Sequence, residues 1–208
     1  MTAAETQTED HHSEQRYQRL MAVTRRAARN GYDAISMRQI AAASSMSMTT
    51  IYQYCTSKDH LIAEAHLEWM ENFRDEMLKR PPRGRSAATR VSTYIKQITS
   101  AWETHETLTM TLQRAIYSMD PGVRDVRAAL ARAYTDFMQV AIGDENVPNR
   151  DSAVEILGHV IDSVTHGWVT GRFTAGQASA VLQRTVSTLL PKPTSPSSSR
   201  RELRPAAR

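Results

Sequence analysis

Cysteine is nearly absent from this chain, and long apolar runs are missing. Cys55 is the single cysteine among 208 residues, so no disulfide can form within one chain and no second thiol is available for a zinc cluster. No apolar run reaches the roughly eighteen residues that a membrane span needs, and residues 1–20 lack the basic and then apolar pattern of a secretory signal. These absences predict a cytoplasmic protein with no membrane span, no bound metal and no redox role.

Signals for strands and for catalysis are missing as well. No segment alternates polar and apolar residues convincingly, and no Gly-rich phosphate loop, Gly-x-Ser-x-Gly motif or supported Cys/His pair occurs. His60, Glu64 and Glu68 are spaced to share one helix face and could in principle hold a metal. A surface ion pair is the favoured interpretation, because no third strong ligand or partner motif accompanies them. We therefore expect an all-α protein that is not an enzyme and uses no cofactor.

The positive charge is concentrated in two segments. Residues 16–60 carry seven Lys or Arg against two Asp, and residues 191–208 carry five basic residues against one Glu. Residues 1–15 are acidic, whereas residues 61–190 are almost balanced. A compact basic block beside a balanced body is typical of a small nucleic-acid-binding domain joined to a body with another task, although a merely solvated surface is the alternative.

Apolar residues recur at three- and four-residue spacing through most of the chain, which predicts helices. Gly31 should end the first helix, and Ser36, Ser47 and Ser57 should cap the next three. The expected helices are 16–30, 37–43, 47–54, 57 to about 80, 86–103, 106–118, 121–143, 150–172 and 175–190.

Two of these helices, 37–43 and 47–54, are short and joined by a tight turn, which predicts a helix-turn-helix whose second helix enters the major groove of DNA. Ile51 should point inward, whereas the hydroxyls and phenols of this second helix can bond phosphates and its Thr methyl groups can contact thymine. Arg38 is suited to a guanine edge and Lys58, at the start of a helix, to a phosphate.

Two stretches, "NGYDAISMRQIA" from Asn30 and "MSMTTIYQYCTSKDHL" from Met46, resemble the N-terminal domain of the TetR family of bacterial repressors, in register over residues 16–65. The resemblance implies a homodimer that binds a palindromic operator, with a helical C-terminal domain that binds a small molecule and dimerises through the last two helices. It places the following residues at DNA-contact positions: Ser36, Arg38, Ser47, Met48, Thr49, Thr50, Tyr52, Gln53, Tyr54 and Lys58.

Three departures from the family pattern stand out. Ser44-Ser45 replaces the usual Ala-Gly of the turn, and a Ser in the left-handed region costs about 1 kcal/mol. Met48-Thr49 replaces a common Lys-Gly, which removes a phosphate-binding charge and predicts an unusual operator. Cys55 replaces a packed Phe and should behave as a small apolar residue.

The domain organisation expected from these observations is an acidic disordered arm (1–15), the DNA-binding domain (16–60), a helical effector-binding and dimerisation domain (61–190) and a disordered basic tail (191–208). Glycines at 158, 167 and 171 either allow close helix packing at the dimer interface or weaken their helix. Aromatic, Met and polar residues of the third domain are candidates for the effector pocket, with ordinary core packing as the alternative. These candidates are Trp102, Met110, Gln113, Tyr117, Phe137 and His166.

The body is also similar in length and layout to actinobacterial TetR-like repressors of sterol and lipid catabolism, which implies a hydrophobic or acyl-CoA-like effector. Such a ligand could tilt the DNA-binding domains by displacing the fourth helix through Trp69 and Phe73. A second hypothesis is a DNA-binding architectural protein of the same fold that acts through a protein partner and has a sealed C-terminal core. A third is a helical adaptor that does not contact DNA.

Overall fold

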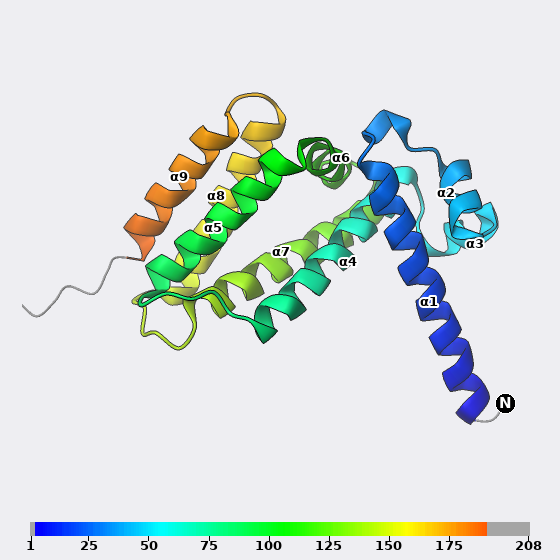
Figure 1. The fold of residues 1–208 in the computed structure, drawn as a ribbon, viewed down its shortest axis with the longest axis horizontal. Helices are drawn as coiled ribbons and strands as arrows, with labels where there is room; N and C mark the ends of the chain where they lie inside the picture. Colours follow the sequence, from blue (N-terminus) through cyan, green and yellow to red (C-terminus); the bar gives the residue numbers. More distant parts are fainter. Residues whose placement is uncertain (1–2, 191–208) are drawn as a thin grey trace, which may run out of the picture.

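The computed structural model describes residues 3–190, and in these residues the chain is helical with no strand, which confirms the all-α prediction (Figure 1). No helix in this range is long and apolar enough to cross a membrane. The elements are α1 (Ala3–Ala28), η1 (Tyr32–Ala34), α2 (Met37–Ser44), α3 (Met48–Tyr54), α4 (Lys58–Lys79), α5 (Ala87–Thr104), α6 (Glu106–Ile116), α7 (Pro121–Ile142), α8 (Arg150–Val169) and α9 (Ala175–Leu189).

The first helix is longer than predicted. An acidic disordered arm was expected over residues 1–15, but α1 begins at Ala3 and its N-terminal part extends away from the other helices (Figure 1). Gln15 and Gln18 hydrogen-bond to His11 and Glu14 one turn earlier, at 2.8 and 2.7 Å. The prediction of disorder was wrong here because such pairs, in a segment rich in helix-forming Ala, Glu and Gln, support a helix despite its polar composition. The predicted basic tail, residues 191–208, lies outside the described residues.

An N-terminal core joins α1 to α4 and includes part of α6. Leu20, Ile40 and Ile51 are buried together, as predicted, and Ile62 of α4 and Leu112 of α6 belong to the same cluster. The predicted domain boundary after residue 60 therefore falls inside α4. A movement of α4 or α6 would displace the helix-turn-helix, since both helices supply side chains to its core.

A second core fills the C-terminal body. Helix α4 packs along α7, while α9 packs against both α5 and α8. Tyr94 and Phe137 stack at the centre with ring centroids 5.5 Å apart, and Trp102 stacks on Trp168 at 5.3 Å. Because α4 contributes to this core as well, it is the mechanical link between the two halves of the chain.

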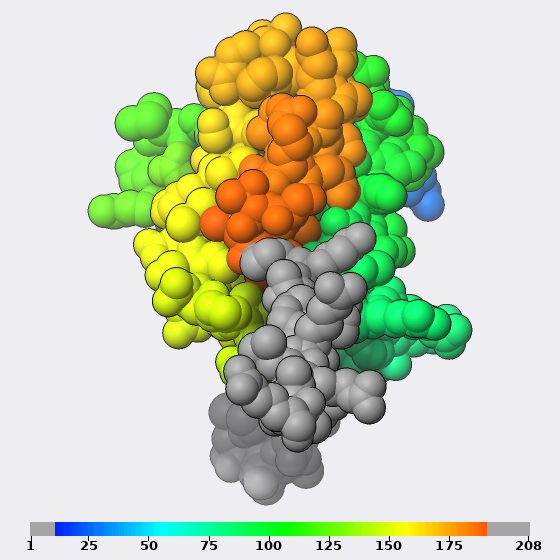
Figure 2. Space-filling view, turned by 90° about the vertical axis from the view of Figure 1, so that its left-hand side faces the viewer, coloured from blue at the N-terminus to red at the C-terminus, as the bar shows by residue number. Residues whose placement is uncertain are grey.

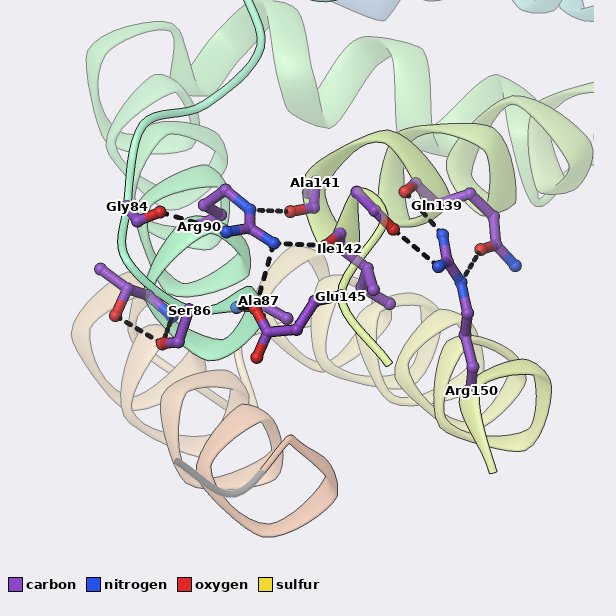
Figure 3. Close-up of polar contacts among 11 residues, drawn as sticks. Gly84, Ser86, Ala87, Arg90, Gln139, Ala141, Ile142, Glu145 and Arg150 are labelled. Atoms are coloured by element: carbon purple, nitrogen blue, oxygen red, sulfur yellow. Dashed lines mark hydrogen bonds and ion pairs between the residues drawn. The ribbon is translucent and has the colours of Figure 1, made fainter. Parts of the chain in front are cut away.

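Two arginines hold the end of the body that lies farthest from α2 and α3 (Figure 3). Arg90 of α5 donates to the carbonyl oxygens of Ala141 and Ile142, and Arg150 of α8 donates to those of Gln139 and Gly143. The last carbonyls of a helix have no partners within the helix and carry partial negative charge, so two cations there join α5 and α8 to the end of α7.

The three glycines, two in α8 and one in the turn after it, differ in their surroundings within one chain. A Cβ built on Gly167 would lie 2.5 Å from Cδ2 of Phe173, so this glycine allows the chain after α8 to fold back closely. Gly158 has no neighbour within 4 Å of such a Cβ, and Gly171 has a φ of 75° in the turn after the helix. Close packing within one chain therefore applies to Gly167, whereas the role of Gly158 at a dimer interface stays a prediction.

Candidate nucleic-acid interface and effector cavity

The turn between α2 and α3 has the conformation expected from the sequence. Ser45 adopts φ 57° and ψ 40°, the left-handed region, and the Met46 amide donates to the carbonyl of Ala41 at 2.9 Å. Ser44 is buried, and its hydroxyl donates to the carbonyl of Ile40 at 2.8 Å. The hydroxyl of Ser44 thus has a hydrogen-bond partner inside the turn. Ser45 adopts a strained backbone conformation that glycine would adopt freely.

Helix α3 presents a polar face to solvent. Ser47 caps its N-terminus by accepting from the Thr50 amide at 3.0 Å, and Ile51 is fully buried on the opposite side. Tyr52 is 52% exposed although it is a large aromatic residue, and Gln53 beside it is also exposed. An exposed aromatic residue with a polar tip, on a short polar helix, is suited to contact with another molecule.

The other predicted DNA-contact residues fall around this helix and remain predictions. Arg38 and Thr49 are exposed, whereas Ser36, Met48, Thr50 and Lys58 are partly exposed. Tyr54 is partly buried, because its ring lies 5.7 Å from that of Tyr17. None of the ten residues is buried in the core, so each of them can be reached from solvent.

A cluster around Tyr32 connects this region to α6, and sequence reasoning did not identify it. Lys58 and Arg114 both lie over the Tyr32 ring, at 4.0 and 3.9 Å from its centroid. The Tyr32 hydroxyl donates to Asp59, which also accepts from Ser118 at 2.5 Å. Burial and the bond to Asp59 raise the pKa of Tyr32 to about 12, so it stays a neutral donor. A candidate phosphate-binding lysine is thereby linked to the end of α6.

The described part of the C-terminal body contains several hollows, of which two are lined by candidate effector residues. One, of about 440 Å³, lies between α6, α7 and α8 beside Tyr117, and the other, of about 340 Å³, lies between α1, α4, α5 and α6 beside Trp102. His66, Gln113 and Tyr134 line both, so these three side chains form the wall between them. The body therefore lacks the sealed core that is expected for an architectural protein without an effector.

Two residues that line the second cavity each carry a buried polar group with no hydrogen-bond partner among the described residues. The Tyr94 hydroxyl and Nδ1 of His66 are both in this state, although Tyr94 is fully buried and His66 is 4% exposed. Burial lowers the pKa of His66 to about 4 and raises that of Tyr94 well above its usual value, so both are neutral near pH 7. Buried polar groups are normally paired, and unpaired ones on a cavity wall indicate that a bound molecule or water completes them.

The candidate effector residues separate into two groups. Trp102 and Gln113 line the second cavity, while Tyr117 and Gln113 line the first. Met110 is on the surface, Phe137 is packed in the core, and His166 is exposed with its ring edge-on to Tyr117 at 4.7 Å. These last three line neither cavity. Residue type alone did not distinguish a wall from a core or a surface, since all three positions suit a helical bundle.

The pair His60 and Glu64 forms a hydrogen bond of 3.2 Å, in agreement with the favoured interpretation of an ion-pair position. His60 Nδ1 also accepts from the Thr56 amide at 3.1 Å, which uses the second ring nitrogen. Among residues 3–190, no group of three or more His, Cys, Asp or Glu side chains is arranged to hold a metal.

These features define a class: a helix-turn-helix regulator with a helical body that contains cavities. Residues 20–65 match the model of the bacterial regulatory proteins of the tetR family, so this part of the chain is similar to the N-terminal domain of that family. The chain is 29% identical, over 178 residues that cover 85% of this chain and 83% of the relative, to the HTH-type transcriptional repressor KstR of Rhodococcus jostii (strain RHA1).

Solved structures share the fold. A TetR transcriptional regulator from Rhodococcus sp. RHA1 superimposes with a TM-score of 0.74 at 16% identity, covering 88% of this chain and all of that one (100%). The transcriptional regulator FadR from Bacillus subtilis, in complex with stearoyl-CoA, gives a TM-score of 0.56 at 16% identity, with 84% of this chain and 98% of that chain covered. At this level of identity the likeness concerns the fold alone.

Proposed function

We propose that the protein is a dimeric transcriptional repressor that binds a palindromic operator through α3 and is released by a small, largely apolar effector. The observation that carries the proposal is the second cavity, because residues of α1, α4, α5 and α6 line it. One bound molecule would therefore touch the first helix of the DNA-binding region and three helices of the body at once.

The DNA-binding part of the proposal rests on the exposure of α3 and its surroundings. Tyr52, Gln53 and Thr49 would reach the major groove, and Arg38 and Lys58 would fix the position by contacting a base edge and a phosphate. The other contacts follow from the family resemblance. Two copies of α3 must be about 34–36 Å apart to read successive major grooves, so the geometry of the dimer decides whether the operator is bound.

The dimer would form through α8 and α9. These two helices pack together and lie side by side on the outer face of the body (Figure 2). On α8, Ile156 is 46% exposed despite its apolar side chain. An interface at this end leaves α3 of each protomer free, and it makes the separation of the two recognition helices depend on α4, which links the halves of each chain.

The effector would act through the walls of the second cavity. Trp69 and Phe73 of α4 line it, so a guest that separates α4 from α5 would move the N-terminal core. The effect requires that the guest bind the DNA-free arrangement more tightly, typically by about 1 to 3 kcal/mol. The similarity to KstR, a repressor, and to the fold of FadR, solved with stearoyl-CoA, supports a regulator of this kind.

An architectural protein that acts through a protein partner is the alternative function. An architectural protein would also need the exposed α3, but its function would not require cavities lined with unpaired polar groups. The presence of such groups on Tyr94 and His66 favours the ligand-responsive protein. An adaptor that does not contact DNA accounts for neither the exposed Tyr52 nor the basic block.

The first experiment is retention of sheared genomic DNA by the purified protein at about 150 mM salt, near physiological ionic strength, followed by sequencing. A palindrome enriched by the wild type and lost with Tyr52→Ala is expected. Lys58→Ala should weaken retention of every sequence, since a phosphate contact carries no sequence information. Its matched control is Lys79→Ala at the other end of α4, where the exposed lysine pairs with Glu76, and it should retain DNA as the wild type does.

The outcomes separate the alternatives. An enriched palindrome whose retention falls when lipid-like compounds are added supports the repressor. An enriched sequence that no small molecule releases would favour the architectural protein. Equal retention by all the variants and the wild type would mean that α3 does not read DNA, and the proposal would have to be abandoned.

A further inference from the structure

The second cavity has positive charge on one wall. Arg25 and Arg29, one turn apart near the end of α1, both line it. The rest of the lining is dominated by apolar and aromatic side chains, with Trp69, Phe73 and Trp102 among them. An otherwise apolar cavity with two guanidinium groups at one wall is chemically asymmetric.

The two arginines are in different states. Arg25 is partly buried, and its guanidinium contacts the carboxylate of Glu68, whose side chain is 7% exposed and also accepts from Asn72 at 2.6 Å. The Arg29 side chain is exposed and makes no hydrogen bond or ion pair within the described residues. Glu68 balances Arg25, so Arg29 leaves one uncompensated positive charge beside the cavity.

The remaining titratable groups around the cavity do not cancel this charge. His66 is neutral near pH 7 because burial lowers its pKa to about 4, and Tyr94 and Tyr134 are neutral because burial raises their pKa values. The exposed His105 lies at the same cavity and adds no negative charge. No carboxylate belongs to the lining of the cavity.

Resting on the proposed function, we propose that the effector is an apolar molecule that carries an oxyanion, such as a carboxylate, which Arg29 binds and which competes with Glu68 for Arg25. The apolar part lies among the aromatic side chains, and the oxyanion is held on α1. Guanidinium groups bind carboxylates and phosphates in a two-pronged geometry that suits this position.

In this arrangement the charge of the ligand affects the contact between α1 and α4. The oxyanion competes with Glu68 for Arg25, and the pair of Arg25 with Glu68 connects α1 to α4. An anionic ligand therefore loosens a contact between the first helix and the linking helix, whereas a neutral ligand of the same shape leaves it in place. The apolar part supplies affinity, and the charged part acts on the DNA-binding region.

The test compares two probes of equal chain length, dodecanoate and dodecanol, that differ in charge. Trp69 and Trp102 lie in the cavity wall, so binding can be followed by intrinsic fluorescence without DNA. We expect dodecanoate to bind the wild type at least about tenfold more tightly than dodecanol, the equivalent of about 1.4 kcal/mol. Arg29→Gln should remove that preference while leaving the affinity for dodecanol unchanged.

Arg29→Lys, which keeps the charge without the fork, should retain part of the preference, and Arg26→Gln is the matched control. Arg26 is exposed on the same turn of α1 but does not line the cavity, so its loss should change nothing. Equal binding of the two probes by the wild type, no binding of either, or an undiminished preference in Arg29→Gln would overturn the assignment.

Retention of DNA is measured in parallel, so that the two proposals can fail separately. If the protein prefers dodecanoate tenfold but still binds its operator in saturating dodecanoate, the oxyanion site is supported. The release of DNA by a ligand would then have to be dropped from the proposed function. Operator binding released equally by both probes would leave the repressor standing and refute the role of the charge.

Discussion

Replacement of Arg90 by Ala should destabilise the body without changing how α3 meets DNA. Arg90 donates to the carbonyl oxygens of Ala141, Ile142 and Gly84, and its guanidinium also pairs with Glu145 at 3.3 Å (Figure 3). The side chain is 18% exposed, so water can replace only part of these bonds. Removing it leaves the carbonyls of Ala141 and Ile142 and one carboxylate without their cation.

The magnitude follows from the bonds that are lost. A hydrogen bond from a charged donor contributes about 1.5 to 3 kcal/mol, but several bonds to one group are not additive and partial hydration offsets some of the loss. We expect the free energy of unfolding to fall by about 2 to 4 kcal/mol. For a domain of this size each kcal/mol lowers the melting temperature by about 2 to 4 °C, so the shift should be easily measured.

The assay is urea denaturation at one fixed protein concentration, because the proposed dimer would be stabilised by mass action. Arg74→Ala is the matched control, since Arg74 is 32% exposed and contacts Asp75 and Asp136 at 3.2 and 3.9 Å. Surface pairs of this kind contribute less than about 1 kcal/mol. Arg90→Lys should lie between the two, because it keeps the charge but loses the fork. A loss for Arg90→Ala no larger than for Arg74→Ala would refute the reasoning.

Three further predictions concern single positions. The pKa of His66 is lowered to about 4, below its unfolded value near 6.5, so the unfolded chain binds a proton first and stability should fall by up to about 3 kcal/mol as pH drops from 6.5 towards 4; denaturation of His66→Leu over this range should show a smaller decline, and an equal decline would contradict the assignment. Ser45→Gly should raise stability by up to about 1 kcal/mol in thermal denaturation, because Ser45 has a φ of 57°, and a drop would show that the turn is not strained. Gly167→Ala should cost about 1 to 3 kcal/mol through its clash with Phe173, whereas Gly158→Ala should be neutral or stabilising; similar melting temperatures for the two would refute the close approach.

The boundaries of the helices were largely predictable because short-range signals set them. Ser47 and Ser57 cap α3 and α4 as expected, each accepting from a backbone amide three residues on. Gly31 follows α1 with a φ of 96°, which few residues other than glycine adopt readily. The prediction of an acidic disordered arm over residues 1–15, in contrast, was based on overall composition and not on such short-range signals. Composition suggested disorder, but pairs one turn apart support the helix that begins at Ala3.

The effector residues were less predictable because a cavity is a property of packing between helices. Trp102 and Phe137 have the same character in sequence, yet one lines a cavity and the other fills the core. Arg25 and Arg29 were counted only as part of the basic block, and nothing in their spacing indicated that α5 and α6 would come to face them. The cluster of Tyr32, Lys58 and Arg114 was missed for the same reason, since its members come from distant parts of the chain.

The sequence by itself determined the helical class, the helix-turn-helix and the polar face of α3, because capping, turn chemistry and helical periodicity act over a few residues. The tertiary structure alone decided where the body is hollow, which polar groups in the cavity wall lack partners, and that α4 and α6 supply side chains to the N-terminal core. These features arise when helices far apart in sequence pack together, and no local pattern encodes the space that they leave between them.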